Sequence, residues 1–205
     1  MTDTKSFHEV HDTRRVYRSL LDSMARPGKL HDLSPQMNSI PNAIPLFSGT
    51  YALGRTLLDA QTTFYLETEN NEAASYLELR TGSRMLAAER ADYLFIETQP
   101  SVDLIRTLMQ QIRIGTLLEP EKSATLIIRV RALSDSETSG ITMTLSGPGI
   151  KKRRTLSADG FNPEWLRMRA ARNMEYPTGC DFILISDNGQ MAALPRTTMI
   201  ESEAV

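Results

Sequence analysis

A glycine-rich turn that runs directly into four cations is the part of this sequence best suited to chemistry. Residues 145–156 read Leu-Ser-Gly-Pro-Gly-Ile-Lys-Lys-Arg-Arg-Thr-Leu, which places Gly147 and Gly149 beside a basic run that ends in Arg153 and Arg154. Backbone N–H groups that lie next to positive charge suit an anion such as phosphate. The same pattern is typical of a hairpin turn followed by a solvated edge strand, in which lysine blocks unwanted pairing. The sequence leaves both interpretations open.

A second segment near the end of the chain carries similar chemistry. Residues 194–198 read Leu-Pro-Arg-Thr-Thr, so that a guanidinium and two hydroxyls follow a strand signal. An arginine fork binds phosphate or phosphonate oxygens in a bidentate manner, although a proline at a strand end with exposed polar neighbours gives the same pattern. The candidate anion-binding residues are therefore Gly147, Gly149, Arg153, Arg154, Arg196, Thr197 and Thr198.

Two further groups of residues suggest other chemistry, which we consider less favoured. His8 and His11 would share one face of a helix, but a metal would need a third ligand from elsewhere, so we expect no metal site. Cys180 opens an apolar strand, and the histidines that a nucleophilic cysteine needs all lie within the first 31 residues. We expect Cys180 to be a small buried side chain.

Composition limits the function classes. The 205 residues predict a single domain, 1–205, and a net charge of −2 gives no overall bias toward nucleic acid or membrane. The single cysteine excludes an intramolecular disulfide and a cysteine-ligated cluster built from this chain alone. The sequence begins without an apolar leader pattern, and its apolar runs are far shorter than the ~20 residues of a membrane-spanning helix. We expect a cytoplasmic protein.

The elements that must position these residues follow from hydrophobic periodicity. A helix is predicted to begin at Ser6 and to end near Ala25 before Pro27-Gly28, with a buried stripe that consists of Val10, Tyr17, Leu20, Leu21 and Met24. Further helices are predicted at 42–59, 72–79, 102–112 and 163–173, and strands at 63–67, 93–96, 124–133, 141–145, 181–185 and 191–194. Residues 186–189, Ser-Asp-Asn-Gly, predict a hairpin between the last two strands.

The alternation of helices and strands predicts an α/β fold, with a mixed sheet that is covered by helices on both faces. The strand at 141–145 is expected to be the antiparallel neighbour of the strand at 124–133. No repeat or low-complexity linker marks a domain boundary.

Several ordered motifs resemble the PhnH family, the H subunit of the bacterial carbon–phosphorus lyase machinery. They are Tyr-Arg-Ser-Leu-Leu-Asp-Ser-Met-Ala-Arg-Pro-Gly at 17–28, Leu-Asp-Ala-Gln-Thr-Thr-Phe-Tyr-Leu at 58–66, Thr-Gly at 81–82 with Ala-Asp-Tyr-Leu-Phe at 91–95, Pro-Glu-Lys-Ser-Ala-Thr-Leu-Ile at 120–127, Leu-Ser-Gly-Pro-Gly-Ile at 145–150 and Leu-Pro-Arg-Thr-Thr at 194–198. The chain departs from the family pattern at Tyr176-Pro177-Thr178-Gly179, where the family usually reads Phe-Pro-Arg-Gly.

The resemblance implies a three-layer fold similar to that of pyridoxal-phosphate-dependent transferases, but without the cofactor. It also implies a homodimer that joins the G, I and J subunits in a complex for organophosphonate catabolism. In that family the G, H, I and L components are implicated in replacing the adenine of MgATP with a phosphonate, which gives a ribose 1-phosphonate 5-triphosphate. Radical chemistry on the J subunit then breaks the carbon–phosphorus bond.

The residues favour a structural or co-catalytic subunit over an enzyme that acts alone. One cysteine cannot hold a radical-generating cluster, and none of the five lysines follows a buried strand with an evident aspartate partner, as a pyridoxal-phosphate site requires. The alternative is a stand-alone enzyme or sensor that binds a phosphorylated or phosphonylated small molecule, including a nucleotide, through residues 147–154 and Arg196. We expect no cofactor. We also expect that the chain binds neither nucleic acid nor a membrane.

Overall fold

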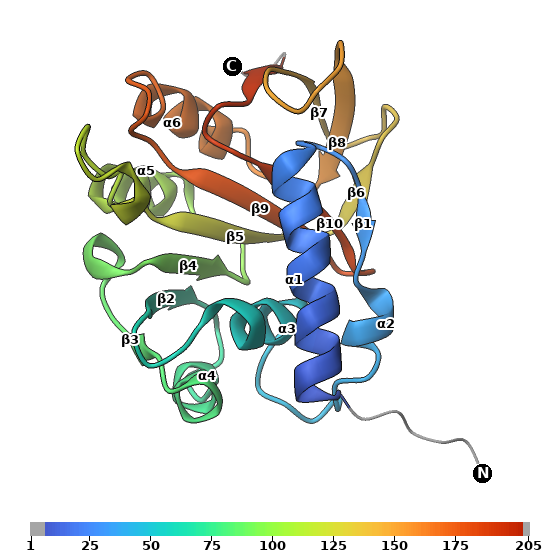
Figure 1. Cartoon of the computed structure of the whole chain (residues 1–205), viewed down its shortest axis with the longest axis vertical. Helices are drawn as coiled ribbons and strands as arrows, with labels where there is room; N and C mark the ends of the chain where they lie inside the picture. Colours follow the sequence, from blue (N-terminus) through green and yellow to red (C-terminus); the bar gives the residue numbers. More distant parts are fainter. Residues whose placement is uncertain (1–6, 203–205) are drawn as a thin grey trace.

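The computed structural model describes residues 7–202, which form two β-sheets surrounded by helices (Figure 1). The strands of the larger sheet are β1 (His31–Asp32), β2 (Thr63–Glu67), β3 (Arg84–Met85), β4 (Tyr93–Ile96), β5 (Thr125–Val130), β9 (Asp181–Ser186) and β10 (Gln190–Leu194). They lie in the order β1-β10-β9-β5-β4-β2-β3. Strands β3, β2, β4, β5 and β9 pair in parallel, and β10 is antiparallel to both of its neighbours. The predicted α/β class with a mixed sheet is confirmed.

Side chains of the central strands alternate between two apolar cores. Phe95, Ile127 and Ile183 contribute to one core, while Leu94 and Leu126 contribute to the other. Both sets are almost completely shielded from solvent. This burial on both sides explains why these strands read as continuous apolar runs in the sequence.

Four helices cover one face of the larger sheet, and two cover the other. The first group consists of α1 (Glu9–Ala25), α2 (Ser34–Met37), α3 (Ser48–Leu57) and α4 (Ala73–Thr81), and the second of α5 (Val102–Gln111) and α6 (Glu164–Arg172). Two short 3-10 helices, η1 (Ala88–Arg90) and η2 (Pro120–Lys122), lie in the connections. In Figure 1, α1 crosses the sheet, and α5 and α6 lie together beside it.

A second sheet, which the sequence did not predict, packs on the same core as α5 and α6. Its strands are β6 (Ala132–Ser134), β7 (Ile141–Ser146), β8 (Arg154–Asp159) and β11 (Met199–Glu201), in the antiparallel order β11-β7-β8-β6. The single strand predicted at 124–133 is wrong, because the chain leaves the larger sheet after Val130 and enters the second sheet at Ala132. The expected pairing of 141–145 with this strand is also wrong, since β8 lies between β6 and β7.

The first helix buries a different face from the one predicted. Its core contacts come from Val16, Leu20 and Ser23, and Val10, Tyr17 and Leu21 are among its exposed residues. Leu20 and the partly buried Met24 do pack as predicted. Apolar residues lie on both the buried and the exposed sides of this helix. Periodicity alone therefore predicted a buried stripe that is wider than the one in the structure.

The helix boundaries also differ at two places. Helix α1 begins after His8, whose Nδ1 accepts the N–H of His11, while the predicted start residue Ser6 lies outside the described residues. Helix α3 begins at Ser48 and not at 42. The glycines within it allow close packing as expected, because a Cβ at Gly54 would lie 3.0 Å from Leu77 Cδ1. The remaining predicted elements are confirmed to within about two residues at each end.

Candidate functional site

The glycine turn brings three separate segments of backbone together. A Cβ at Gly147 would lie 2.9 Å from the carbonyl oxygen of Thr197, and one at Gly149 would lie 2.3 Å from that of Ala25. Both glycines also have positive φ, 122° and 80°. Only glycine allows such approaches, so the turn packs against both the end of α1 and the segment that precedes β11.

The cations after the turn point to different neighbours. Lys151 and Lys152 are exposed, and Arg153 pairs with Glu201 at 3.1 Å. Arg154 donates from Nη1 to the carbonyl oxygen of Pro27 at 2.7 Å. The expectation of an edge strand is wrong, because Arg154 begins β8 in the interior of the second sheet. Anion binding by Arg153 and Arg154 remains a prediction.

Arg196 joins three loops through its guanidinium group. It forms an ion pair with Asp181 at 2.7 Å between Nη2 and Oδ2, and both side chains are largely buried. Its Nη1 donates to the carbonyl oxygens of Pro120 and Pro177 at 2.9 and 3.2 Å, and its Nη2 also donates to Ser123. Asp181 therefore compensates the charge of Arg196 within the protein itself.

The glycine turn and the segment after β10 do meet, at the wall of a cavity of about 610 Å³ between α6 and the C-terminal segment. The cavity is lined by Pro148, Leu166, Arg169, Ala170, Asn173, Tyr176, Arg196, Thr197, Thr198, Met199 and Ile200. Of the seven predicted site residues, Arg196, Thr197 and Thr198 line it directly. Gly147 and Gly149 flank Pro148, whereas Arg153 and Arg154 are not among the lining residues.

Arg169, the more deeply buried of the two cations in this cavity wall, was not predicted from the sequence. Its side chain lies on the buried face of α6 with Trp165, and the residue is only 4% exposed. Burial lowers the pKa of Arg169, because the charged form loses its hydration. The sequence does contain a signal for this burial, because Arg169 lies four residues after the only tryptophan, Trp165, and so on the same side of the helix.

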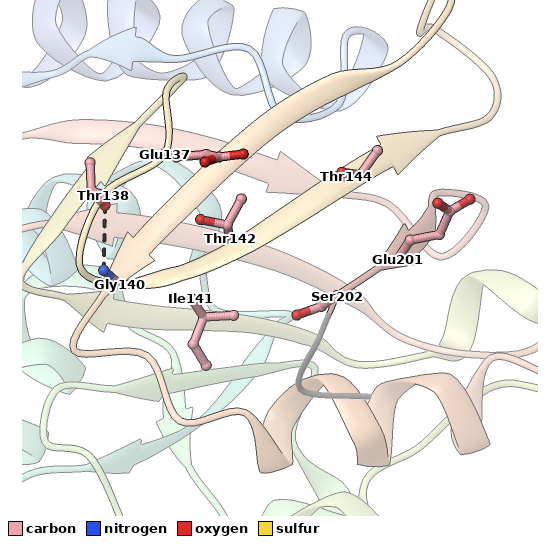
Figure 2. Close-up of a pocket in the computed structure, with 8 residues that line it drawn as sticks. All are labelled: Glu137, Thr138, Gly140, Ile141, Thr142, Thr144, Glu201 and Ser202. Atoms are coloured by element: carbon pink, nitrogen blue, oxygen red, sulfur yellow. Dashed lines mark hydrogen bonds between the residues drawn. The ribbon is translucent and has the colours of Figure 1, made fainter.

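A larger hollow of about 770 Å³ lies at the second sheet (Figure 2). It is lined by Glu137, Thr138, Gly140, Ile141, Thr142, Thr144, Glu201 and Ser202. Figure 2 shows the two carboxylates and the threonine hydroxyls around it. Two acidic groups and no cationic side chain in the lining disfavour an anion, so the smaller cavity is the better candidate for the predicted chemistry.

The histidine pair is part of a helix cap. His8 Nδ1 accepts the N–H of His11 at 3.3 Å, and Asp12 Oδ2 accepts the N–H of His8 at 2.7 Å. These bonds satisfy backbone donors at the start of α1. Among residues 7–202, no cluster of three histidine, cysteine or acidic side chains has the arrangement of a metal site.

Cys180 is fully buried, and burial raises its pKa to about 12. A thiol with such a pKa is neutral at physiological pH, which fits the expected role as a small core side chain and not as a nucleophile. Asn173 holds this position, because its side chain bonds both the N–H and the carbonyl oxygen of Cys180.

The loop that departs from the expected family pattern lies beside the cavity. Thr178 is only 7% exposed, and its hydroxyl donates to the carbonyl oxygen of Glu175. Tyr176, in the same loop, is 71% exposed at the cavity wall. Threonine at position 178 lacks the positive charge with which an arginine would bind an anion.

Comparisons with known proteins give a consistent result. A family model described as "Bacterial phosphonate metabolism protein (PhnH)" matches residues 5–201. A protein of Stutzerimonas stutzeri named "Putative C-P lyase subunit protein HtxG" is 29% identical over 186 residues, which cover 90% of this chain and 84% of that protein. The "Alpha-D-ribose 1-methylphosphonate 5-triphosphate synthase subunit PhnH" of Rhizobium meliloti (strain 1021) is 30% identical over 197 residues, 95% of this chain and 92% of that protein.

No helix within residues 7–202 is both long enough and apolar enough to cross a membrane. The longest helix, α1, has 17 residues and carries several charged side chains.

Proposed function

This chain belongs to the PhnH family of bacterial phosphonate metabolism proteins, and we propose that it serves as a subunit of a carbon–phosphorus lyase system for organophosphonate catabolism. The observation that carries this proposal is the family match over residues 5–201, together with two relatives of similar length whose names describe such a subunit.

Within this system we propose that the chain supports the formation of a ribose 1-phosphonate 5-triphosphate from MgATP and an alkylphosphonate. The name of the Rhizobium meliloti relative describes a synthase subunit for the methylphosphonate form of this product. The candidate cavity has no carboxylate, histidine or lysine in its lining, and Tyr176 is the one lining residue of a type that commonly transfers protons. A structural or co-catalytic role, with the reacting groups on other subunits, fits this lining.

The partners that we propose are the G, I and J subunits for assembly, and G, I and L for the synthase reaction. The test is a reconstitution with MgATP and methylphosphonate, in which adenine release is followed by chromatography with this chain present or omitted. We expect adenine release to require this chain. Full activity in its absence, together with no co-purification with G, I and J, would contradict the proposal.

We propose a homodimer as the form in which the chain enters the complex. The exposed residues Val10, Tyr17 and Leu21 lie on one side of α1, because their spacing of seven and four places them within one stripe. Such a stripe is suited to a contact with a second copy, in which the same surface meets itself across a two-fold axis.

We further propose that the fold follows the three-layer layout of pyridoxal-phosphate-dependent transferases without using the cofactor. The seven-stranded mixed sheet between two helical layers supports this layout. The four lysines within the described chain, Lys29, Lys122, Lys151 and Lys152, all lie at the surface and not in a cavity where a Schiff base would be sheltered.

A cytoplasmic location is part of the same proposal. The proposed synthase reaction consumes MgATP, and the lone cysteine is a buried free thiol, which suits a reducing compartment.

A further inference from the structure

Two loops at one edge of the larger sheet present large apolar side chains to solvent. The first loop leads from α5 to β5 and carries Leu117 and Leu118, which are 61% and 93% exposed. The second leads from α6 to β9 and carries Met174 and Tyr176, which are 83% and 71% exposed. Single exposed apolar residues are common on protein surfaces, but a group of them marks a surface that contacts another molecule.

Hydrogen bonds hold the two loops together. The backbone N–H of Gly179 donates to the carbonyl oxygen of Ile114 at 2.8 Å. Nη1 of Arg196 donates to the carbonyl oxygens of both Pro120 and Pro177. Figure 1 shows both loops projecting on the same side of the molecule, next to α5 and α6. The four apolar side chains therefore belong to one surface, which we call the two-loop surface.

The first loop is braced by its own backbone. Residues 113–124 fold back on themselves and carry the leucine pair at the tip. The N–H of Glu119 donates to Oγ1 of Thr116 at 3.0 Å, and a Cβ at Gly115 would lie 2.9 Å from the carbonyl oxygen of Pro120. The tip is thus held in place before any partner binds, which reduces the conformational entropy that binding would cost.

A hollow of about 320 Å³ lies between the two loops. Its charged lining residues are Glu121, Asp181 and Arg196, and the last two compensate each other in their ion pair. The carboxylate of Glu121 forms no ion pair within residues 7–202. Tyr176 lines the same hollow. An unpaired carboxylate together with an aromatic ring suits a cationic side chain, which gains an ion pair and a cation–π contact.

The loops themselves carry an excess of negative charge. Residues 114–122 and 173–179 contain three glutamates and a single lysine, Lys122, which pairs with Glu119. Glu121 and Glu175 are exposed and form no ion pair with another part of the described chain. A second copy that met this surface across a two-fold axis would bring these carboxylates together. The charge therefore favours a different protein, one with a basic surface.

We propose that the two-loop surface is the docking site of another protein subunit, whose contact surface is an apolar patch bordered by lysine or arginine. The apolar patch lies against Leu117, Leu118 and Met174. One cationic side chain enters the hollow between Glu121 and Tyr176. This inference rests on the proposed subunit role and names the surface that serves it. Helix α1 covers the opposite face of the larger sheet from α5 and α6, so the proposed dimer leaves the two-loop surface accessible.

The test is biolayer interferometry with the immobilised full chain and a purified assembly of the G, I and J subunits as the probe. We expect the wild type to bind. Leu118→Glu should weaken binding at least about tenfold, a difference of about 1.4 kcal/mol, because it places a charge in an apolar contact. Leu79→Glu is the matched control, since Leu79 is 82% exposed on α4, and it should bind as the wild type does.

A second pair of variants tests the cationic side chain of the partner. Glu121→Lys should weaken binding at least about tenfold, because two like charges then meet in the hollow. Glu121→Gln should weaken binding less and should make the Kd less sensitive to salt. Glu137→Lys reverses an exposed charge in the connection between β6 and β7, and as the control it should leave the Kd unchanged.

The proposal is overturned if the wild type does not bind the assembly, or if Leu118→Glu or Glu121→Lys binds as tightly as the wild type. It is also overturned if Leu118→Glu lowers the mass of the chain alone in light scattering, since the surface would then belong to a second copy. Adenine release tests the proposed function separately. Release that requires this chain, with Leu118→Glu still binding normally, would overturn the docking surface and leave the proposed function standing.

Discussion

Two arginines in one cavity wall have different hydrogen-bond partners. Asp181 accepts bonds from the backbone N–H and the side chain of Arg196, whereas Arg169 donates to backbone carbonyl oxygens. Arg196 consequently behaves as a structural clamp between β9 and the loop that contains Pro120.

The role of Arg196 as a clamp predicts that its loss destabilises the folded protein. Arg196→Gln would leave Asp181, whose side chain is 12% exposed, without its cation, and we expect a loss of about 3 kcal/mol in the free energy of unfolding. Urea denaturation measures it. Arg153→Gln is the matched control, because its partner Glu201 is 60% exposed, and it should cost less than about 1 kcal/mol. Equal effects of the two variants would show that Arg196 is not a clamp.

At the scale of the element, the glycine turn at 147–149 packs against the end of α1 and against the segment before β11. Gly82 provides a comparison for Gly149, since it also has positive φ but a Cβ there would meet no atom closer than 3.8 Å. We expect Gly82→Ala to cost about 1–2 kcal/mol for its backbone conformation. Gly149→Ala should cost about 1–3 kcal/mol more, because its Cβ would overlap the Ala25 carbonyl oxygen.

Chemical denaturation of the two alanine variants checks this prediction. If Gly149→Ala were no less stable than Gly82→Ala, the close approach of the turn to the end of α1 would not be what requires glycine.

Helices α5 and α6 are joined by a pH-sensitive contact. Glu164 accepts bonds from Arg106 and Arg167 at 2.7 and 2.6 Å, and the bond from Arg106 is the main reason that its pKa is lowered from the ordinary 4.5. A lowered pKa in the folded state stabilises the protein above pH 4.5. This contribution is lost as the pH falls through the folded-state value.

We therefore expect the urea midpoint of the wild type to fall as the pH is lowered from 5 toward 3. The midpoint of Glu164→Gln, which keeps the shape but cannot titrate, should fall less over the same interval. Parallel curves for the two proteins would contradict a stabilising role for the ionised Glu164.

At the scale of the whole molecule, the exposed stripe on α1 bears on the proposed dimer. Leu21 is 51% exposed and lies close to Tyr17 on the same side of the helix. We expect light scattering of the wild type to give the mass of two chains, and Leu21→Glu to shift it toward one chain, because a buried unpaired charge opposes association. Arg15→Glu, which changes an exposed charge on another side of α1, is the control. A monomeric wild type would contradict the dimer.

Much of the architecture was predictable from local patterns. Helix α5 and strands β2 and β4 lie where periodicity placed them, because their apolar residues have the spacing of the element and clear end signals. The division of 124–133 between two sheets was not predictable. The change occurs at Arg131, whose N–H bonds to the carbonyl oxygen of Asp159, and such a contact between residues far apart leaves no local pattern.

The sequence by itself determined the family and the types of most elements, since these depend on ordered motifs and on residues that are near one another in the chain. Only the tertiary structure decided which cations are compensated. Arg153 and Arg196 pair with carboxylates 48 and 15 residues away, whereas Arg154 and Arg169 donate to backbone carbonyl oxygens. Charge compensation is decided by distance in space, and a sequence records only distance along the chain.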